Sequence, residues 1–93
     1  MKFFIDTINS APLVEIADLQ SGREILNTIN HKVSISNPKG STKYVGFLVI
    51  DYIFRTLIQE YPNIIEVILR TDGDNAAKFS SLKLGYTKPP TNS

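Results

Sequence analysis

Residues 45–61 read VGFLVIDYIFRTLIQEY, and this stretch decides the fold. Apolar side chains fill most of it, while Asp51, Arg55 and Gln59 recur at intervals of four residues. That interval places side chains on one face of an α-helix, so the segment predicts a helix with a narrow polar side. Serine and threonine precede the segment and Pro62 follows it, as is typical of helix limits. We therefore expect a helix that is buried on nearly all sides against a sheet.

The segments on either side of this helix predict two strands. Residues 32–36 (KVSIS) alternate polar and apolar side chains, and residues 64–70 (IIEVILR) form a mostly apolar run. Two strands joined through one long helix lie parallel in the same sheet. The loop between the first strand and the helix, residues 37–43 (NPKGSTK), carries two lysines and no acidic residue.

The remaining segments complete an α/β domain. Residues 2–7 (KFFIDT) predict a further strand. Residues 13–30 fit either a helix or strands, and we favour a β-hairpin because a helix over the whole range would carry Gly22 in its interior. An acidic residue precedes a second predicted helix at about 75–84, which Gly85 ends. We expect a mixed, mostly antiparallel sheet that contains one parallel pair.

Length and composition limit the classes of function. The 93 residues are expected to form one compact domain over 1–88 with a flexible tail at 89–93. The absence of cysteine excludes a disulfide scaffold, a thiolate zinc site and a cysteine nucleophile. His31 is the single histidine, so no metal site is expected.

Charge and hydropathy suggest where the chain works. Ten basic and nine acidic side chains leave a net charge of +1, so nucleic acid is not an expected partner. No apolar run is long enough for a membrane span, and the first residues do not resemble a signal peptide. The sequence therefore predicts a cytoplasmic protein that does not bind membranes.

The loop before the long helix has the features of an anion site. The first amides of a helix have no intrahelical partner, and the helix dipole adds partial positive charge there, which places the site near residues 43–47. Lys39 and Lys43 flank this position, and Gly46 would let a ligand approach the backbone. The alternative on these residues alone is a solvated loop with an ordinary helix cap.

The order of motifs over residues 32–87 resembles the GNAT superfamily of acyl-CoA-dependent N-acetyltransferases. Pro38 stands where that family's strand ends, and residues 41–46 (STKYVG) occupy its six-residue R/Q-x-x-G-x-G/A loop. Residues 83–86 (KLGY) match the family's terminal motif. The upstream N-x-x-A element is matched by Asp74 or Asn75 together with Ala77.

The resemblance implies a fold, a co-substrate and an activity. The fold would be α/β with a GNAT-like mixed β-sheet, a long helix after a phosphate-binding-type loop and a second C-terminal helix. The co-substrate would be acetyl-CoA, whose acetyl group passes to an unidentified amine. The alternative is a catalytically inactive module of the same fold that acts by CoA binding or protein contact. The implied cofactor-binding residues are Ile35, Ser36, Ser41, Thr42, Lys43, Tyr44, Val45, Gly46, Phe47 and Asn75.

The chain departs from the family pattern at several implied site positions. Ser41 replaces an arginine or glutamine, and Tyr44 replaces the first glycine of the loop. Ser80 or Ser81, depending on a one-residue shift of alignment, takes the place of the tyrosine that protonates the leaving thiolate, and we assign Ser81 to that catalytic role.

Two further expectations concern the base and the oligomeric state. The candidate bases are Glu15, Glu24 and His31, and the sequence does not select one of them. Aromatic residues recur at helical spacing along 47–61, and exposed members of that stripe could form the face of a homodimer.

Overall fold

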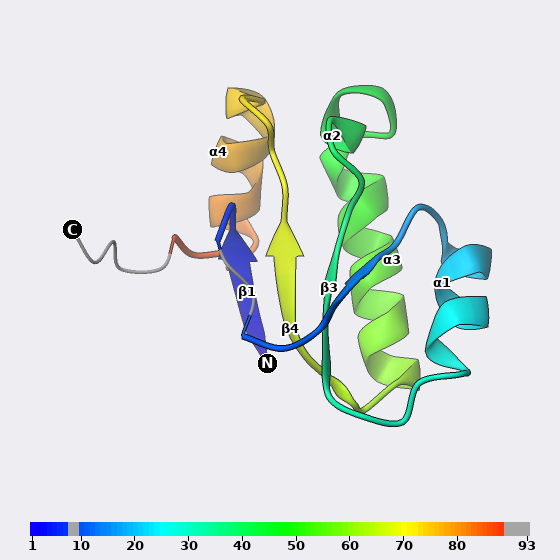
Figure 1. Ribbon diagram of the computed structural model, residues 1–93. Helices are drawn as coiled ribbons and strands as arrows, with labels where there is room; N and C mark the ends of the chain where they lie inside the picture. Colours follow the sequence, from blue (N-terminus) through cyan, green and yellow to red (C-terminus); the bar gives the residue numbers. More distant parts are fainter. Residues whose placement is uncertain (8–9, 89–93) are drawn as a thin grey trace.

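The computed structural model describes residues 1–7 and 10–88 (Figure 1). The predicted tail at 89–93 lies outside the described residues. In chain order the elements are β1 (Lys2–Ile5), β2 (Leu13–Glu15), α1 (Leu19–Leu26), β3 (Val33–Ser36), α2 (Ser41–Tyr44), α3 (Phe47–Glu60), β4 (Ile64–Leu69) and α4 (Asn75–Lys83).

The four strands form one sheet in the order β1-β4-β3-β2. The β3–α3–β4 unit has parallel strands, as predicted, with Ile35 opposite Val67. The pairs β1–β4 and β2–β3 are also parallel. The expected mixed, mostly antiparallel sheet is therefore wrong for the described residues, because every strand pair there is parallel. The α/β class itself is confirmed.

The predicted hairpin over 13–30 is also wrong. After the three residues of β2 the chain forms α1, and the Asp18 carboxylate caps this helix by accepting a hydrogen bond from the Ser21 amide at 2.7 Å. Gly22 lies inside the helix and is buried. A Cβ at this position would lie 3.0 Å from Leu57 Cδ1, so the glycine lets α1 pack closely on α3. Gly22, which we took as a reason against a helix, instead allows α1 to pack against α3.

The long helix begins later than residue 45. Gly46 is the N-cap residue of α3 and has φ 94° and ψ 140°, a backbone conformation that side chains with a Cβ rarely adopt. Residues 41–44 form the separate short helix α2, so one continuous helix from Val45 does not exist. The second predicted helix is confirmed as α4, with Asp74 as its N-cap and Gly85 just past its end.

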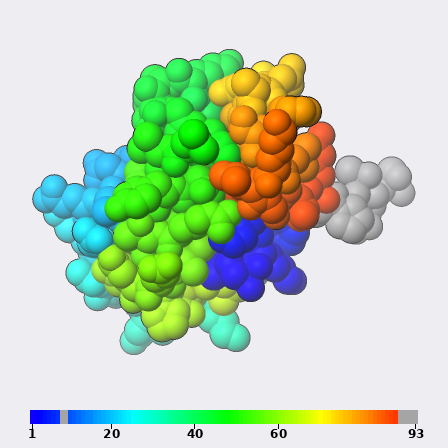
Figure 2. Space-filling model, turned by 180° about the vertical axis from the view of Figure 1, so that it is seen from behind, coloured from blue at the N-terminus to red at the C-terminus, as the bar shows by residue number. Residues whose placement is uncertain are grey.

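One face of the sheet is covered by α1, α3 and α4. Contacts join α1 to α3 and α3 to α4, and Figure 2 shows α3 in green beside α4 in orange on this side. The core lies between this layer and the sheet and includes Phe54, Leu57 and Val67. The expectation that α3 is buried on nearly all sides is wrong, because Leu48 and Tyr52 are exposed. No helix among the described residues is long and apolar enough to cross a membrane.

The opposite face of the sheet is more polar. Ser34 and Glu66 stand at paired positions of β3 and β4, and both are buried. The Glu66 carboxylate accepts hydrogen bonds from the Ser34 hydroxyl at 2.6 Å and from the Ser10 amide at 2.7 Å. Ser10 belongs to the connection between β1 and β2, so this carboxylate ties the connection to the sheet.

Candidate functional site

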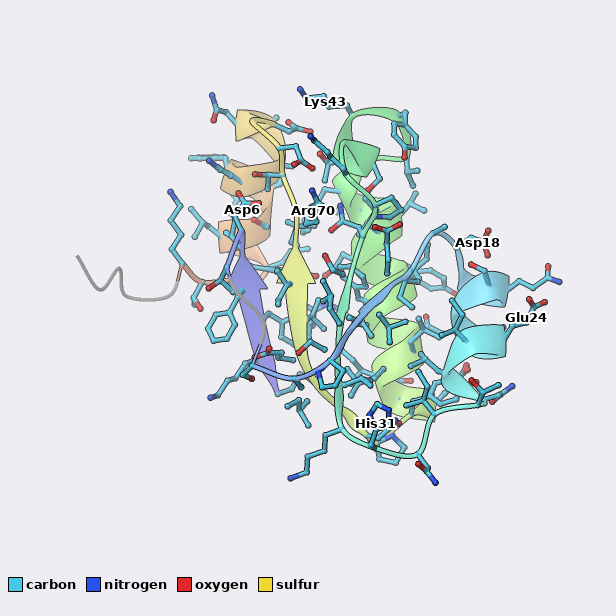
Figure 3. All side chains as sticks on the ribbon, in the orientation of Figure 1. Asp6, Asp18, Glu24, His31, Lys43 and Arg70 are labelled. Atoms are coloured by element: carbon cyan, nitrogen blue, oxygen red, sulfur yellow. The ribbon has the colours of Figure 1, made fainter. Side chains whose placement is uncertain are left out.

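The carboxyl ends of the parallel strands meet at one edge of the molecule. Asp6 follows β1, Arg70 follows β4, and the loop after β3 leads to Lys43 (Figure 3). In open parallel sheets, ligands bind outside the carboxyl ends of the strands. The search for a site therefore begins at this edge.

The side chain of Asn37 fills the space between β3 and β4 beyond their last paired residues. Its oxygen accepts a hydrogen bond from the Arg70 amide at 2.8 Å. Its nitrogen donates to the Arg70 carbonyl at 2.9 Å and to the Ser41 hydroxyl at 2.7 Å. Ile35 and Ser36 remain paired with β4, so the two strands do not separate before Asn37.

Other polar groups at this edge also hold the fold together. The Asp6 carboxylate accepts from the Thr71 amide at 2.8 Å and from the Thr71 hydroxyl. The Asp72 carboxylate accepts from the Gly40 amide at 2.8 Å and lies 3.5 Å from the Arg70 guanidinium. Because these groups are engaged with one another, they join the loops after β1, β3 and β4 and leave little free for a ligand.

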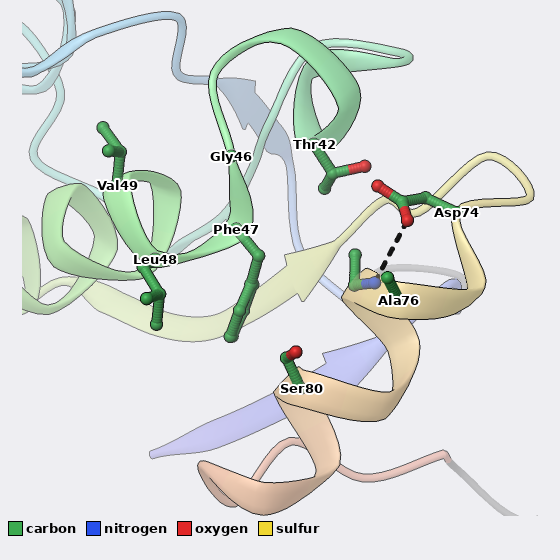
Figure 4. A pocket seen from close by; sticks show the side chains of 9 residues that line it. Thr42, Gly46, Phe47, Leu48, Val49, Asp74, Ala76 and Ser80 are labelled. Atoms are coloured by element: carbon green, nitrogen blue, oxygen red, sulfur yellow. Dashed lines mark hydrogen bonds between the residues drawn. The ribbon is translucent and has the colours of Figure 1, made fainter.

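An open groove lies beside this network, between the first turns of α3 and α4 (Figure 4). Its volume is about 310 Å³, at the lower end of the range for small-molecule sites. Apolar side chains form most of its wall. The lining residues are Thr42, Gly46, Phe47, Leu48, Val49, Asp74, Ala76, Ala77 and Ser80.

The first turn of α3 supplies amide donors to the groove. No side chain caps this helix, and the first N–H groups of a helix, here Phe47 to Val49, have no intrahelical carbonyl to bond. The amides predicted to be free, at residues 43–47, are only partly so. The Lys43 amide donates to the Gly40 carbonyl at 3.1 Å and the Val45 amide to the Ser41 carbonyl at 2.8 Å, because α2 forms its own turn. The donors therefore lie further along the chain than expected.

Thr42 places a hydroxyl at the edge of the same groove. The residue is 5% exposed, and its hydroxyl has no hydrogen-bond partner of normal geometry among the described residues. The hydroxyl still lies close enough to the Asp74 carboxylate to lower the pKa of Asp74, and the Ala77 amide and the charge of Lys43 lower it further. Figure 4 shows the Thr42 hydroxyl and the Asp74 carboxylate pointing toward each other.

The predicted cofactor-binding residues separate into three groups. Thr42, Gly46 and Phe47 line the groove. The others near the loop do not: Ser41 is buried against Asn37, Val45 is half-buried, and Lys43, Tyr44 and Asn75 are exposed. Ile35 lies in the core, and Ser36 is buried in the sheet, so neither reaches the groove.

The predicted catalytic groups lie outside the groove. Ser81 is fully buried, and its hydroxyl donates to the Lys78 carbonyl at 2.8 Å. Ser80, the neighbouring alternative, lines the groove. The candidate bases Glu15, Glu24 and His31 do not line it. Figure 3 places Glu24 on α1 and His31 at the opposite end of the molecule from Lys43.

Sequence reasoning missed two features of this region. It assigned Asp74 to helix capping, which is correct, since the carboxylate accepts from the Ala77 amide at 3.1 Å, but it did not place that carboxylate in a groove. It placed Asp51 on the narrow polar side of the helix without a partner, and the structure shows that Asp51 is buried and accepts from the Tyr86 hydroxyl at 2.7 Å. The apolar run around Asp51 is the signal that could have indicated its burial.

No cluster of three or more histidine, aspartate or glutamate side chains suited to a metal ion occurs within residues 1–7 and 10–88. The groove is thus built from amides, hydroxyls, one carboxylate and apolar walls. Such a set can bind a ligand that carries both an anionic group and an apolar part.

Comparisons with known proteins give one relative. The chain is 38% identical over 73 residues to "Uncharacterized protein RP547" of Rickettsia prowazekii (strain Madrid E). The match covers 77% of this chain and 69% of that protein. No family model matches the sequence, and no solved structure matches it.

Proposed function

The chain belongs to the same family as "Uncharacterized protein RP547" of Rickettsia prowazekii, and from its groove we propose that it binds acetyl-CoA, with the diphosphate at the start of α3. The co-substrate comes from the resemblance of the loop and the terminal motif to the acyl-CoA-dependent N-acetyltransferases, and not from the sheet, whose described strand pairs are parallel where that resemblance implied a mixed sheet. The position of the diphosphate comes from the geometry of the groove.

The buried, unpartnered hydroxyl of Thr42 carries this proposal. Its approach to the Asp74 carboxylate is outside normal hydrogen-bond geometry, and a buried hydroxyl left without a well-placed partner costs about 1–3 kcal/mol. A phosphate oxygen in the groove would accept a hydrogen bond from it. The amides at the start of α3 and the positive end of the helix dipole favour the same anion.

Charges around the groove act in both directions. Lys43 attracts an anion, and its ammonium is near enough to Asp74 to lower the pKa of that carboxyl. The Asp74 carboxylate repels an anion, but it is already bonded to the Ala77 amide at the start of α4. We therefore expect the diphosphate at the first amides of α3, with the Thr42 hydroxyl rotating from Asp74 toward it.

The shape of the groove suits the rest of such a ligand. Phe47, Leu48 and Ala76 provide apolar wall for a pantetheine arm. Tyr44, which replaces a glycine of the family pattern, is 72% exposed and does not line the groove. Its ring therefore does not obstruct the amides at the start of α3.

Transfer of the acetyl group to an amine has weaker support than binding. Asp74 is the titratable side chain that lines the groove, and its lowered pKa makes it a poor base. Ser80 is the hydroxyl placed to act on a leaving thiolate, and it is a weaker acid than the tyrosine it replaces. We therefore propose a binding module, and release of free thiol with a panel of amines is the result that would instead favour the transferase.

Thermal unfolding with two ligands tests the proposal. Acetyl-CoA should raise the melting temperature, because a ligand at 100 times its dissociation constant adds about 2.7 kcal/mol to stability. Acetyl-pantetheine, which lacks the diphosphate, should raise it much less. Equal shifts for the two ligands, or none at millimolar acetyl-CoA, would contradict a diphosphate site.

A matched pair of variants locates the ligand. Thr42→Val removes the unpartnered hydroxyl with little change of shape, so it should abolish most of the acetyl-CoA shift while the fold persists. Thr56→Val is the control, because its hydroxyl bonds the Tyr52 carbonyl away from the groove. A full shift in Thr42→Val would place the ligand elsewhere. Gly46 is unsuitable for this test, since its φ of 94° strains any side chain.

A further inference from the structure

The outward side of α2 and α3 carries an uncovered apolar face. It consists of Tyr44, Leu48, Val49 and Tyr52, which are 72%, 71%, 50% and 64% exposed. Leu48, Val49 and Tyr52 lie on one side of α3 by helical spacing, and Tyr44 is the last residue of α2. In Figure 2 the green atoms of α2 lie at the top of the helix-covered side of the molecule, and those of α3 extend below them. We call these four residues the apolar face.

The apolar face has no charged side chain within it. Asp51 is the one charged residue between 44 and 54, and it is buried, with hydrogen bonds from Tyr86 and from Arg55. Arg55, the next charge along α3, is held by Asp51 and by the Leu84 carbonyl at 3.0 Å. Lys43, exposed immediately before Tyr44, borders the apolar face, and a second uncharged surface could meet the four residues themselves without desolvating an ion.

The area of the face approaches what a stable interface requires. An aromatic side chain can bury about 150–250 Å², so two tyrosines at these exposures with a leucine and a valine leave on the order of 500 Å² in water. That is near the upper limit for monomeric proteins. A standard interface takes about 800 Å² from each partner, and the apolar face with its immediate surroundings would supply most of it.

We infer that two copies of this chain associate through their apolar faces about a two-fold axis, with the two α3 helices antiparallel. An uncharged face is compatible with itself, which a two-fold interface requires because the same patch serves both copies. The antiparallel arrangement also opposes the two helix dipoles. In the ligand-free dimer Leu48, which also lines the groove, then lies against Tyr52 of the other copy.

Sedimentation velocity of the ligand-free protein over a wide concentration range tests this inference. The parent should sediment as a dimer, and Tyr52→Lys should sediment as a monomer because it places a charge in the interface. Ile25→Lys is the matched control on α1, where Ile25 is also exposed, and it should remain a dimer. A parent that stays monomeric up to millimolar concentration overturns the inference, as does a dimer that Ile25→Lys disrupts as strongly as Tyr52→Lys.

Disulfide crosslinking is a second test, and it does not depend on how well the lysine variant folds. The chain has no cysteine of its own, so an introduced cysteine is the only thiol that can react. An equimolar mixture of Leu48→Cys and Tyr52→Cys chains should form a disulfide-linked dimer under mild oxidation, because these two positions face each other across the interface, and Ile25→Cys should not. Equal crosslinking of the mixture and of Ile25→Cys would contradict the two-fold arrangement. Cosedimentation of a monomeric parent with phospholipid vesicles would assign the apolar face to a lipid surface and overturn the inference.

Discussion

The Asp51 carboxylate is buried between α3 and the C-terminal segment. It accepts hydrogen bonds from the Tyr86 hydroxyl at 2.7 Å and from the Arg55 guanidinium at 3.0 Å. Burial raises the pKa of Tyr86, and the hydrogen bond to Asp51 raises it further, because both favour the neutral phenol. The Tyr86 ring also packs edge-on against Phe3 and Phe47. This pair of polar side chains therefore fixes the C-terminal segment to both β1 and α3.

Tyr86→Phe should lower the free energy of unfolding by about 1–2 kcal/mol at neutral pH, since Asp51 loses one donor and keeps Arg55. Because the pKa of Tyr86 is raised in the folded state, its contribution to stability is complete below the unfolded pKa of about 10. This contribution is lost as the pH rises from that value through the folded-state pKa. Urea unfolding at rising pH should therefore show a steeper loss of stability in the parent than in Tyr86→Phe. Tyr44→Phe, at an exposed position, should follow the parent; an equal effect of both variants would contradict the account.

At the scale of elements, most local signals were read correctly, whereas residues 13–30 and the long-range pairing of the strands were not. The pattern of 32–36 and 64–70 predicted β3 and β4, and Asp74 marked the start of α4. The direction of the sheet could not be predicted, because β1 and β2 pair with strands far along the chain.

The candidate site was predictable to the same degree. Thr42, Gly46 and Phe47, which the family resemblance implied as cofactor-binding residues, line the groove, while the other residues that it implied do not. The rotation of α4 about its axis decides whether Ser80 or Ser81 faces the groove. The sequence does not define this rotation, because its alignment to the family motif is ambiguous by one residue. The packing of Gly22 against Leu57 joins two elements and has no signature in the sequence of either one.

The break between α2 and α3 depends on one glycine. Gly46→Ala should lower the free energy of unfolding by about 1–3 kcal/mol, because a Cβ is strained at φ 94° and ψ 140° even though no neighbouring atom lies within 4 Å of it. Denaturant unfolding measures this change. Unchanged stability would mean that the chain can start α3 with an ordinary backbone conformation, and that α2 and α3 can merge into one helix.

At the scale of the whole molecule, the two faces of the sheet are covered differently. Parallel sheets ordinarily have helices on both faces. Here α1, α3 and α4 cover one face, while the other carries Ser34, Ser36 and Glu66. The bond from the Ser10 amide to Glu66 joins the β1–β2 connection to that second face. The apolar face of α3 remains uncovered because a two-layer domain has no further element to place over it.

Glu66→Gln should therefore lower the free energy of unfolding and make it depend less on pH in the acidic range. Burial raises the pKa of Glu66, but the hydrogen bonds from Ser34 and Ser10 lower it by more, so the folded-state pKa is below its ordinary value. The stabilisation is complete above the unfolded value of about 4.3 and is lost as pH falls through the folded value. We expect Glu66→Gln to cost about 1–2 kcal/mol at neutral pH and to flatten the loss of stability in acid. Glu15→Gln, at an exposed position on β2, should leave the acid dependence of the parent unchanged.

Amide chemical shifts recorded during titration with acetyl-CoA test the central claim most directly. The proposed diphosphate site predicts that the largest changes fall on Phe47, Leu48 and Val49, with smaller ones at Thr42 and at the start of α4. Thr42→Val should weaken these changes, and acetyl-pantetheine should not reproduce those at the start of α3. An absence of shifts at millimolar acetyl-CoA, or shifts confined to residues outside the groove, would contradict the account.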